Sequence, residues 1–234
     1  MLPAETLAPC IDEASIATLD TAASTAPFDA DLLRMPAAAD MRRRITAVVA
    51  LLEKMDHGKL LRKHNPISRL VGADVEARLE FELAGERVLD AIGQLRLAAQ
   101  NARRLGTKLT AAATAITAEQ QRLDAVIDGG KQLLASAAPG DEFHRARFER
   151  RLSNIMALHA ANVLTIEQIA LASRIITGLL DRFTDVETLL LPIWQRNALA
   201  LATSVGASAK HAARDFSSAN VALLDFLKQD VSSS

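Results

Sequence analysis

The sequence predicts an all-α protein, and more narrowly an elongated antiparallel helical bundle or coiled coil of long helices. The first reason is composition, because the 234 residues include 44 alanines, seven phenylalanines, one tryptophan and no tyrosine. Alanine has the highest helix propensity, whereas strands favour the aromatic residues that are scarce here. The second reason is a long heptad repeat of apolar residues in the middle of the chain, a pattern typical of helices that pack side by side.

Residues 1–39 are expected to form a mostly disordered acidic leader. The segment mixes Ala, Pro, Thr, Ser and Asp, and its four prolines interrupt any helical period. Only the stretch IDEASIATLD leaves room for one or two helical turns. The leader holds six acidic residues and one arginine. The long-helix bundle is expected to follow over residues 40–229, and residues 230–234 are expected to be a disordered tail.

A first helix is predicted from about residue 40 to residue 63. Its apolar residues Ile45, Val48, Leu52 and Met55 recur at steps of three and four, as they do on one face of a helix. The stretch HNP ends the helix, because the residue before a proline is pushed out of the helical conformation. This helix has a basic face, made of Arg42, Arg43, Arg44, Lys54, Lys59, Arg62 and Lys63.

The longest helix is predicted from about residue 69 to residue 137, where the heptad repeat is strongest. Steps of three and four from Phe81 to Val126 meet an apolar residue at every position except Glu119. Larger side chains mostly occupy one core position and alanines the other, so neighbouring helices can approach closely. At about 1.5 Å per residue, such a helix is roughly 100 Å long. The Pro-Gly pair at residues 139 and 140 then ends it.

The chain is expected to return in two helices, residues 141–163 and 166–229, with an interruption of the second near Gly206. Thr165 and Gln168 have the spacing of a capping box at the start of the second helix. From Ile169 a second apolar seam runs at heptad spacing as far as residue 193. Two long arms folded back on each other near residues 139 and 140 are therefore expected.

The second seam passes a proline, Pro192, that itself lies off the seam. A proline inside a helix loses a hydrogen bond and collides with the carbonyl group four residues earlier, here that of Thr188. Because the seam keeps its phase, we expect a kink at Pro192 rather than a break. Trp194 follows within the same turn, and it either fills the bend as an internal brace or belongs to a partner-binding surface. The candidate partner-binding residues are Pro192, Trp194, Gln195, Arg196 and Asn197.

Asn197 falls on the next seam position, where an apolar residue is due. A single buried asparagine in a helical seam fixes the register of the helices at some cost in stability. The sequence therefore offers Asn197 as a register residue as well as a partner contact.

The stretch LLLPIWQRNALALA, preceded by LASRIITGLLDRFTDVETLL, resembles the C-terminal signature of the TelA-like toxic anion resistance family, bacterial proteins associated with tellurite resistance. That family carries a proline, a hydrophobic residue, a tryptophan and then a polar or basic group at this place. The stretch HNPISRLVGADVEARLEFELAGERVLDAIGQLRLAAQ is similar to the family's region where a proline-initiated helix opens a long coiled segment. The resemblance covers roughly residues 60–205. Family members are commonly longer, and the family's usual proline followed by polar and aromatic residues in the middle helix is here diluted by alanine. The resemblance implies a cytoplasmic helical stress protein.

The sequence argues against an enzyme and predicts no cofactor and no metal site. His57 and His64 lie seven residues apart, about 10 Å along a helix, which is too far for one metal ion. Cys10 is the single cysteine, so neither a disulfide within the chain nor a cysteine-based metal cage can form. The stretch DGGK lacks the spacing and the preceding strand of a phosphate-binding loop.

The net charge of −1 gives no global attraction to nucleic acid or to an anionic membrane. Two local basic faces remain, the one on the 40–65 helix and the stretch HRARFERR at residues 144–151. The second is offset by nearby acids, which favours a solvated face or a dock for the acidic leader of the same chain. No secretory signal and no transmembrane segment are expected, and peripheral membrane contact remains open.

The function expected from these observations is a non-catalytic helical scaffold of the TelA-like kind. It would act through protein partners in resistance to toxic oxyanions such as tellurite or in envelope stress, with self-association through the heptad seams as a further route. The alternative is a lipid- or nucleic-acid-binding coiled-coil protein that uses the basic 40–65 helix.

Overall fold

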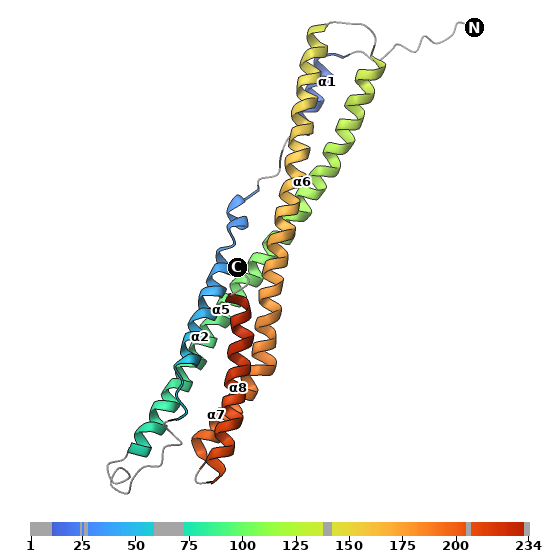
Figure 1. Cartoon of the computed structure of the whole chain (residues 1–234). Coiled ribbons are helices and arrows are strands. Elements are labelled where there is room, and N and C mark those ends of the chain that lie inside the picture. The colour runs from blue at the N-terminus through green and yellow to red at the C-terminus, as the bar shows by residue number, and fades with distance from the viewer. Residues whose placement is uncertain are drawn as a thin grey trace, which may run out of the picture. The chain divides into compact units, whose positions relative to one another are not determined.

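The computed structural model describes residues 11–23, 25, 28–58, 73–137, 142–204 and 207–231. Every regular element in these residues is a helix, which confirms the all-α prediction (Figure 1). The elements are α1 (Glu13–Ala22), the 3-10 helix η1 (Ala30–Arg34), α2 (Pro36–Glu53), α5 (Ala73–Ser136), α6 (Glu142–Asp185), the π-helix η2 (Val186–Leu190), α7 (Leu191–Thr203) and α8 (Ala207–Val231).

The two longest helices, α5 with 64 residues and α6 with 44, confirm the prediction of long helices. The seam predicted on α5 faces the interior, because its positions from Phe81 to Val126 are all buried or half-buried. Glu119, the polar residue of that seam, is 6% exposed and accepts a hydrogen bond from Asn162 Nδ2 at 3.0 Å. The prediction of a heptad seam on α5 is therefore confirmed.

The chain divides into two compact units, Met1–Arg34 with Thr107–Ser173 and Met35–Gly106 with Arg174–Ser234. We call them unit 1 and unit 2. In unit 1, α5 and α6 run antiparallel, because later residues of α5 pair with earlier residues of α6. In unit 1, Gln120 and Glu119 lie beside His159 and Asn162.

Unit 1 is built from α1, η1 and the adjoining parts of α5 and α6. A core cluster joins α1 to both long helices and consists of Ile11, Ile16, Leu19, Leu123, Ile127, Phe148, Leu152 and Ile155. The helices approach closely at Gly130, where a Cβ would lie 2.9 Å from Leu152 Cδ1. At the neighbouring Gly129 nothing lies within 4 Å of that position.

The leader was expected to be mostly disordered, but α1 and η1 within it are helical. Asp12 caps α1 through a capping box, in which its carboxylate accepts from the backbone N–H of Ser15 at 2.9 Å. The Ser15 hydroxyl accepts from the backbone N–H of Asp12 in return. Ile16 and Leu19 then become buried in unit 1. Burial against the long helices stabilises a short helix that would be marginal alone.

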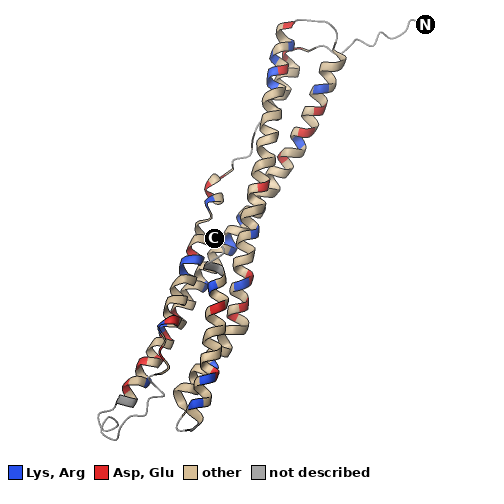
Figure 2. Ribbon diagram, viewed as in Figure 1, with Lys and Arg blue, Asp and Glu red and all other residues tan. Residues whose placement is uncertain are grey.

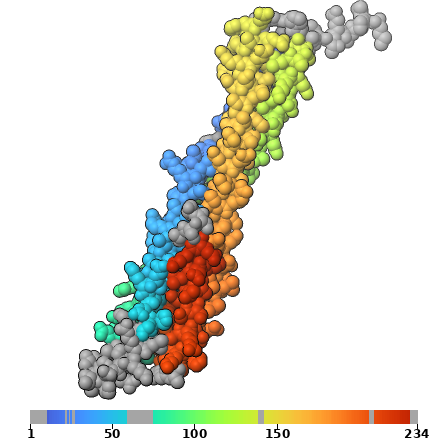
Figure 3. All heavy atoms as spheres, in the orientation of Figure 1, coloured from blue at the N-terminus to red at the C-terminus, as the bar shows by residue number. Residues whose placement is uncertain are grey.

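Unit 2 packs α2, η2, α7 and α8 with the adjoining parts of α5 and α6. In this unit α8 lies against both α2 and α7. Figure 3 shows α8, in red, beside α2, in light blue. The buried residues of α8 recur at helical spacing and are Ala213, Phe216, Asn220, Leu223 and Leu227. The unit therefore has its own core, and among its described residues this core encloses one polar side chain, that of Asn220.

Three predicted boundaries need correction. The helix expected at 40–63 begins at Pro36, because proline suits the first turn of a helix, and it ends at Glu53 with residues 54–57 outside any helix. The predicted break at 164 does not occur, since α6 is continuous and Thr165 Oγ1 donates to the carbonyl of Ala161 at 2.9 Å instead of capping a new start. In the predicted tail, α8 reaches Val231, and residues 232–234 lie outside the described part.

Candidate partner-binding segment and charged faces

The segment before Pro192 is a π-helix, which corrects the expectation that the seam keeps its phase. Up to Val186 the predicted seam positions of α6 and η2 are buried. Beyond the π-helix the predicted Ile193 is 44% exposed, and Leu191 and Trp194 are buried instead. The core face has therefore moved by one residue, as expected when a wide turn takes up one extra residue.

This extra residue gives a physical reason why the helix accepts Pro192. The backbone N–H of Leu191 donates to the carbonyl of Val186, five residues earlier. The widened turn immediately before Pro192 changes the positions of the carbonyls that its ring would meet in a regular α-helix. Arg96 Nε of α5 donates to Glu187 Oε1 at 2.5 Å and ties the π-helix to its neighbour within unit 2.

Trp194 lies in the interior of unit 2 with 1% of its side chain exposed. Its Nε1 donates to Asn220 Oδ1 of α8 at 3.1 Å, and Asn220 Nδ2 donates to the carbonyl of Leu52 of α2 at 3.5 Å. Its ring centroid lies 6.0 Å from that of Phe216, which packs edge-on to Phe81 at 5.1 Å. Trp194 thus joins α7, α8, α2 and α5, as the internal-brace interpretation expects.

The other four candidate residues are more accessible. Pro192, Gln195 and Arg196 are exposed, and Asn197 is half-buried. Asn197 Nδ2 donates to the backbone carbonyl of Asp215 of α8 at 3.3 Å. The structure therefore brings Trp194 and Asn197 against α8 and leaves the remaining three side chains on the surface. Whether they bind a partner stays a prediction.

A groove of about 400 Å³ in unit 2 adjoins this segment, between α5 and α7. Apolar and small residues line its floor, and Glu82 and Glu86 are exposed on the α5 side. Leu199, 66% exposed, stands on the α7 side together with Gln195. The groove offers an apolar surface with acidic groups beside it.

Within α2, Asp40 partly neutralises the basic face that was predicted on the 40–65 helix. Arg43 donates to the carboxylate of Asp40, and Arg44 Nε lies 3.6 Å from the same carboxylate oxygen. Arg42 and Lys54 are exposed. Lys59, Arg62 and Lys63 lie outside the described residues.

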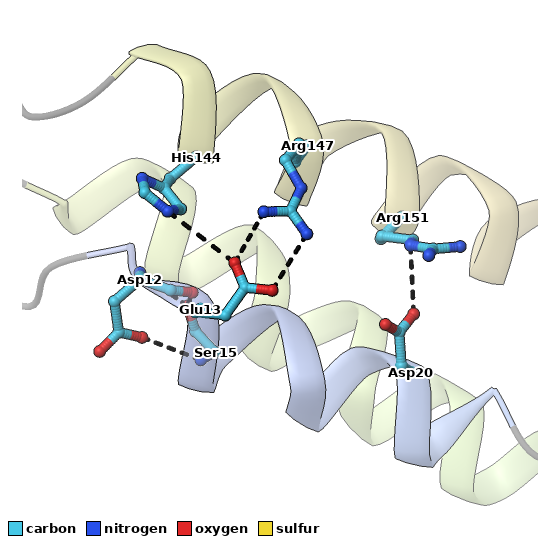
Figure 4. A network of polar contacts seen from close by, with 7 residues as sticks. All are labelled: Asp12, Glu13, Ser15, Asp20, His144, Arg147 and Arg151. Atoms are coloured by element: carbon cyan, nitrogen blue, oxygen red, sulfur yellow. Dashed lines mark hydrogen bonds and ion pairs between the residues drawn. The ribbon is translucent and has the colours of Figure 1, made fainter.

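The second basic stretch contacts the acidic leader, as one of the two sequence interpretations expected (Figure 4). Arg147 of α6 donates to both carboxylate oxygens of Glu13, at 2.7 and 3.0 Å, and His144 Nε2 lies 3.8 Å from Glu13 Oε2. One turn further along α6, Arg151 pairs with Asp20 at 3.1 Å. The bidentate hydrogen bond from Arg147, followed by its charge, lowers the pKa of the Glu13 carboxyl below the usual 4.5.

The helical stretch Glu142–Thr203 is long and apolar enough to cross a membrane by length and composition, and 22% of its most apolar window is buried. Between Arg151 and Glu167 it contains no Asp, Glu, Lys or Arg, which is the uncharged part of α6 in Figure 2. Core helices of soluble proteins meet the same criteria, so this property alone does not define a membrane span. Within the described ranges, no three His, Cys, Asp or Glu side chains are grouped so as to hold a metal ion.

Comparison with known proteins finds a distant similarity. The chain is 28% identical to protein KlaA of Escherichia coli over 183 residues, which covers 74% of this chain and 71% of KlaA. No protein-family model matches the chain, and no solved structure matches it. The similarity thus extends over most of both chains at low identity.

Sequence reasoning missed Asn220, the buried partner of the tryptophan. It assigned the role of buried asparagine to Asn197, because Asn197 stands at heptad spacing from the α6 seam. The missed signal lies in α8, where apolar residues at helical spacing, from Ala213 through Phe216 to Leu223, enclose one asparagine. Such a residue is expected to find a buried hydrogen-bond partner.

Proposed function

We propose that this chain is a non-catalytic helical scaffold of the TelA-like kind, which acts through protein partners in resistance to toxic oxyanions or envelope stress. The observation that carries the proposal is the similarity to KlaA, because it spans 74% of this chain rather than a single motif. The resemblance of LLLPIWQRNALALA to the TelA-like signature supplies the link to tellurite. A cytoplasmic location in a bacterium is part of the same proposal.

The surface proposed for partner contact is the exposed part of α7 with the adjoining groove. Gln195 and Arg196 stand exposed on the helix that Trp194 fixes from inside. A buried aromatic anchor beneath an exposed polar surface holds the backbone of that surface rigid, which reduces the entropy lost on binding. The segment can therefore act as a brace and as a presented surface at once.

The experiment is deletion of the gene in its host, followed by complementation and growth on graded tellurite. The wild-type gene should restore growth, and Gln195→Glu with Arg196→Glu should fail to restore it while the purified variant keeps its melting temperature. Arg42→Gln with Arg43→Glu on α2 changes the net charge by the same amount, is the matched control and should complement. A deletion strain that grows like wild type on tellurite and on other toxic oxyanions would contradict the resistance role.

The alternative, a lipid- or nucleic-acid-binding protein using the basic 40–65 helix, draws less support from α2. Asp40 accepts from Arg43 and lies near Arg44, which reduces the charge available to phosphates. Co-sedimentation with anionic liposomes and a DNA shift assay at several salt concentrations test this alternative, since phosphate-driven binding weakens steeply with salt.

A further inference from the structure

We propose that the surface of unit 1 beneath α1 is a binding site for an acidic amphipathic helix of a partner protein, and that α1 occupies it as a built-in competitor. The inference is independent of the role in oxyanion resistance. It rests on the way α1 is held, on a cleft that α1 leaves open, and on the ease with which so short a helix can detach.

The bound α1 shows what chemistry the site accepts. Ile16 and Leu19 enter the apolar cluster formed by α5 and α6, where they are 1% and 4% exposed. Two acidic residues, Glu13 and Asp20, flank them and meet the basic residues of α6 (Figure 4). A ligand for this site therefore needs one apolar stripe and two carboxylates two helical turns apart.

The site continues beyond the end of α1. A cleft of about 220 Å³ lies there, lined by Leu19, Ala23, Asn154, Ile155 and Leu158, together with Asp20 and Arg151. Ala23, the residue after the last helical residue of α1, is half-buried against the core cluster and contributes only a methyl group. A longer helix with a larger apolar residue at this position fits the surface better than α1 does.

The short length of α1 and its exposed ion pairs are those of a segment that a competing helix can displace. The helix has ten residues, a length at which an isolated helix is marginal in water. Its ion pairs with Arg147 and Arg151 join side chains that are one-third to two-thirds exposed, so salt and competing carboxylates weaken them. Segments with few buried apolar contacts open at lower free energy than the core around them.

The test uses the full chain and two labelled peptides. One peptide is the α1 sequence, residues 11–23, and the other carries leucine in place of Ala23 and is extended by four alanines, which favour a further helical turn. In the chain, Glu13→Arg with Asp20→Arg releases α1 by placing like charges against α6. The released chain should bind the α1 peptide about tenfold or more tightly than wild type does, and the longer peptide more tightly still.

Charge variants on α6 show whether the peptides use the proposed site. Arg147→Glu with Arg151→Glu, added to the released chain, should abolish peptide binding. Arg145→Glu with Arg150→Glu changes the net charge equally on the same helix and should leave peptide binding within about threefold. Circular dichroism confirms that each variant keeps its helix content.

A second measurement needs no released variant. Ala23→Leu in the otherwise wild-type chain should slow amide hydrogen exchange in α1 by about threefold or more, because the new side chain fills the cleft. The proposal is overturned if the released, folded chain binds neither peptide, or if wild type binds them as tightly as the released chain. Unchanged exchange in the Ala23→Leu chain would also overturn it.

Discussion

Replacing Trp194 by alanine tests the internal brace of unit 2. The side chain is 1% exposed, and its loss leaves a cavity bordered by Phe216 and by Gly85, whose Cβ position lies 4.0 Å from the indole ring. Truncation of a buried tryptophan costs about 3–5 kcal/mol. Part of this cost is the acceptor oxygen of Asn220, which loses the indole N–H in a buried site.

Thermal melts followed by circular dichroism measure the effect. At about 2–4 °C per kcal/mol for a domain of 150–250 residues, Trp194→Ala should lower the melting temperature by about 6–20 °C. Gln195→Ala is the matched control, because Gln195 is exposed on the same turn and its truncation should change stability by less than about 0.5 kcal/mol. Equal melting temperatures for the two variants would show that Trp194 does not brace α7, and the reasoning would fail.

Three further predictions concern the helix backbone and the leader. Pro192→Ala should change the free energy of unfolding by less than about 1 kcal/mol in urea unfolding. The restored backbone hydrogen bond stabilises the folded chain, whereas the greater conformational entropy of the unfolded chain without proline opposes this gain. A loss above about 2 kcal/mol would contradict this balance. Gly129→Ala should stabilise the chain by about 0.5–1 kcal/mol. Gly130→Ala should stabilise the chain less or destabilise it, because its methyl group meets Leu152 of α6. Equal gains in stability in thermal melts would refute the close approach of α5 and α6 at Gly130. Because pairing lowers the pKa of Glu13 below 4.5, its contribution to docking is present above pH 4.5 and is lost as the pH falls through the lower folded-state value. The anisotropy of a fluorophore on Cys10 should fall in that acidic range, and Glu13→Gln should reduce this dependence. The part that remains is assigned to the Asp12 cap, because the hydrogen bond from the Ser15 backbone also lowers the pKa of the Asp12 carboxyl.

The long helices and their interior faces could be read from the sequence, because helical periodicity is a local property. The seam from Phe81 to Val126 needed only the spacing of apolar residues along one helix. For α1 the sequence predicted only one or two helical turns in IDEASIATLD, and the capping residues Asp12 and Ser15 were not identified. This helix was underestimated, because its stability comes from Ile16 and Leu19 packing on residues more than 100 positions away.

The sequence by itself determined that this protein is helical, that α5 is a long seam-bearing helix and that the region around Pro192 departs from a regular helix. The tertiary structure decided how that departure is made. Leu191 bonds to the carbonyl five residues back, and the shift of one residue turns Trp194 inward to Asn220. Spacing along one helix cannot show this, because the choice between an α and a π turn depends on which side chains α2, α5 and α8 can bury and satisfy across the unit.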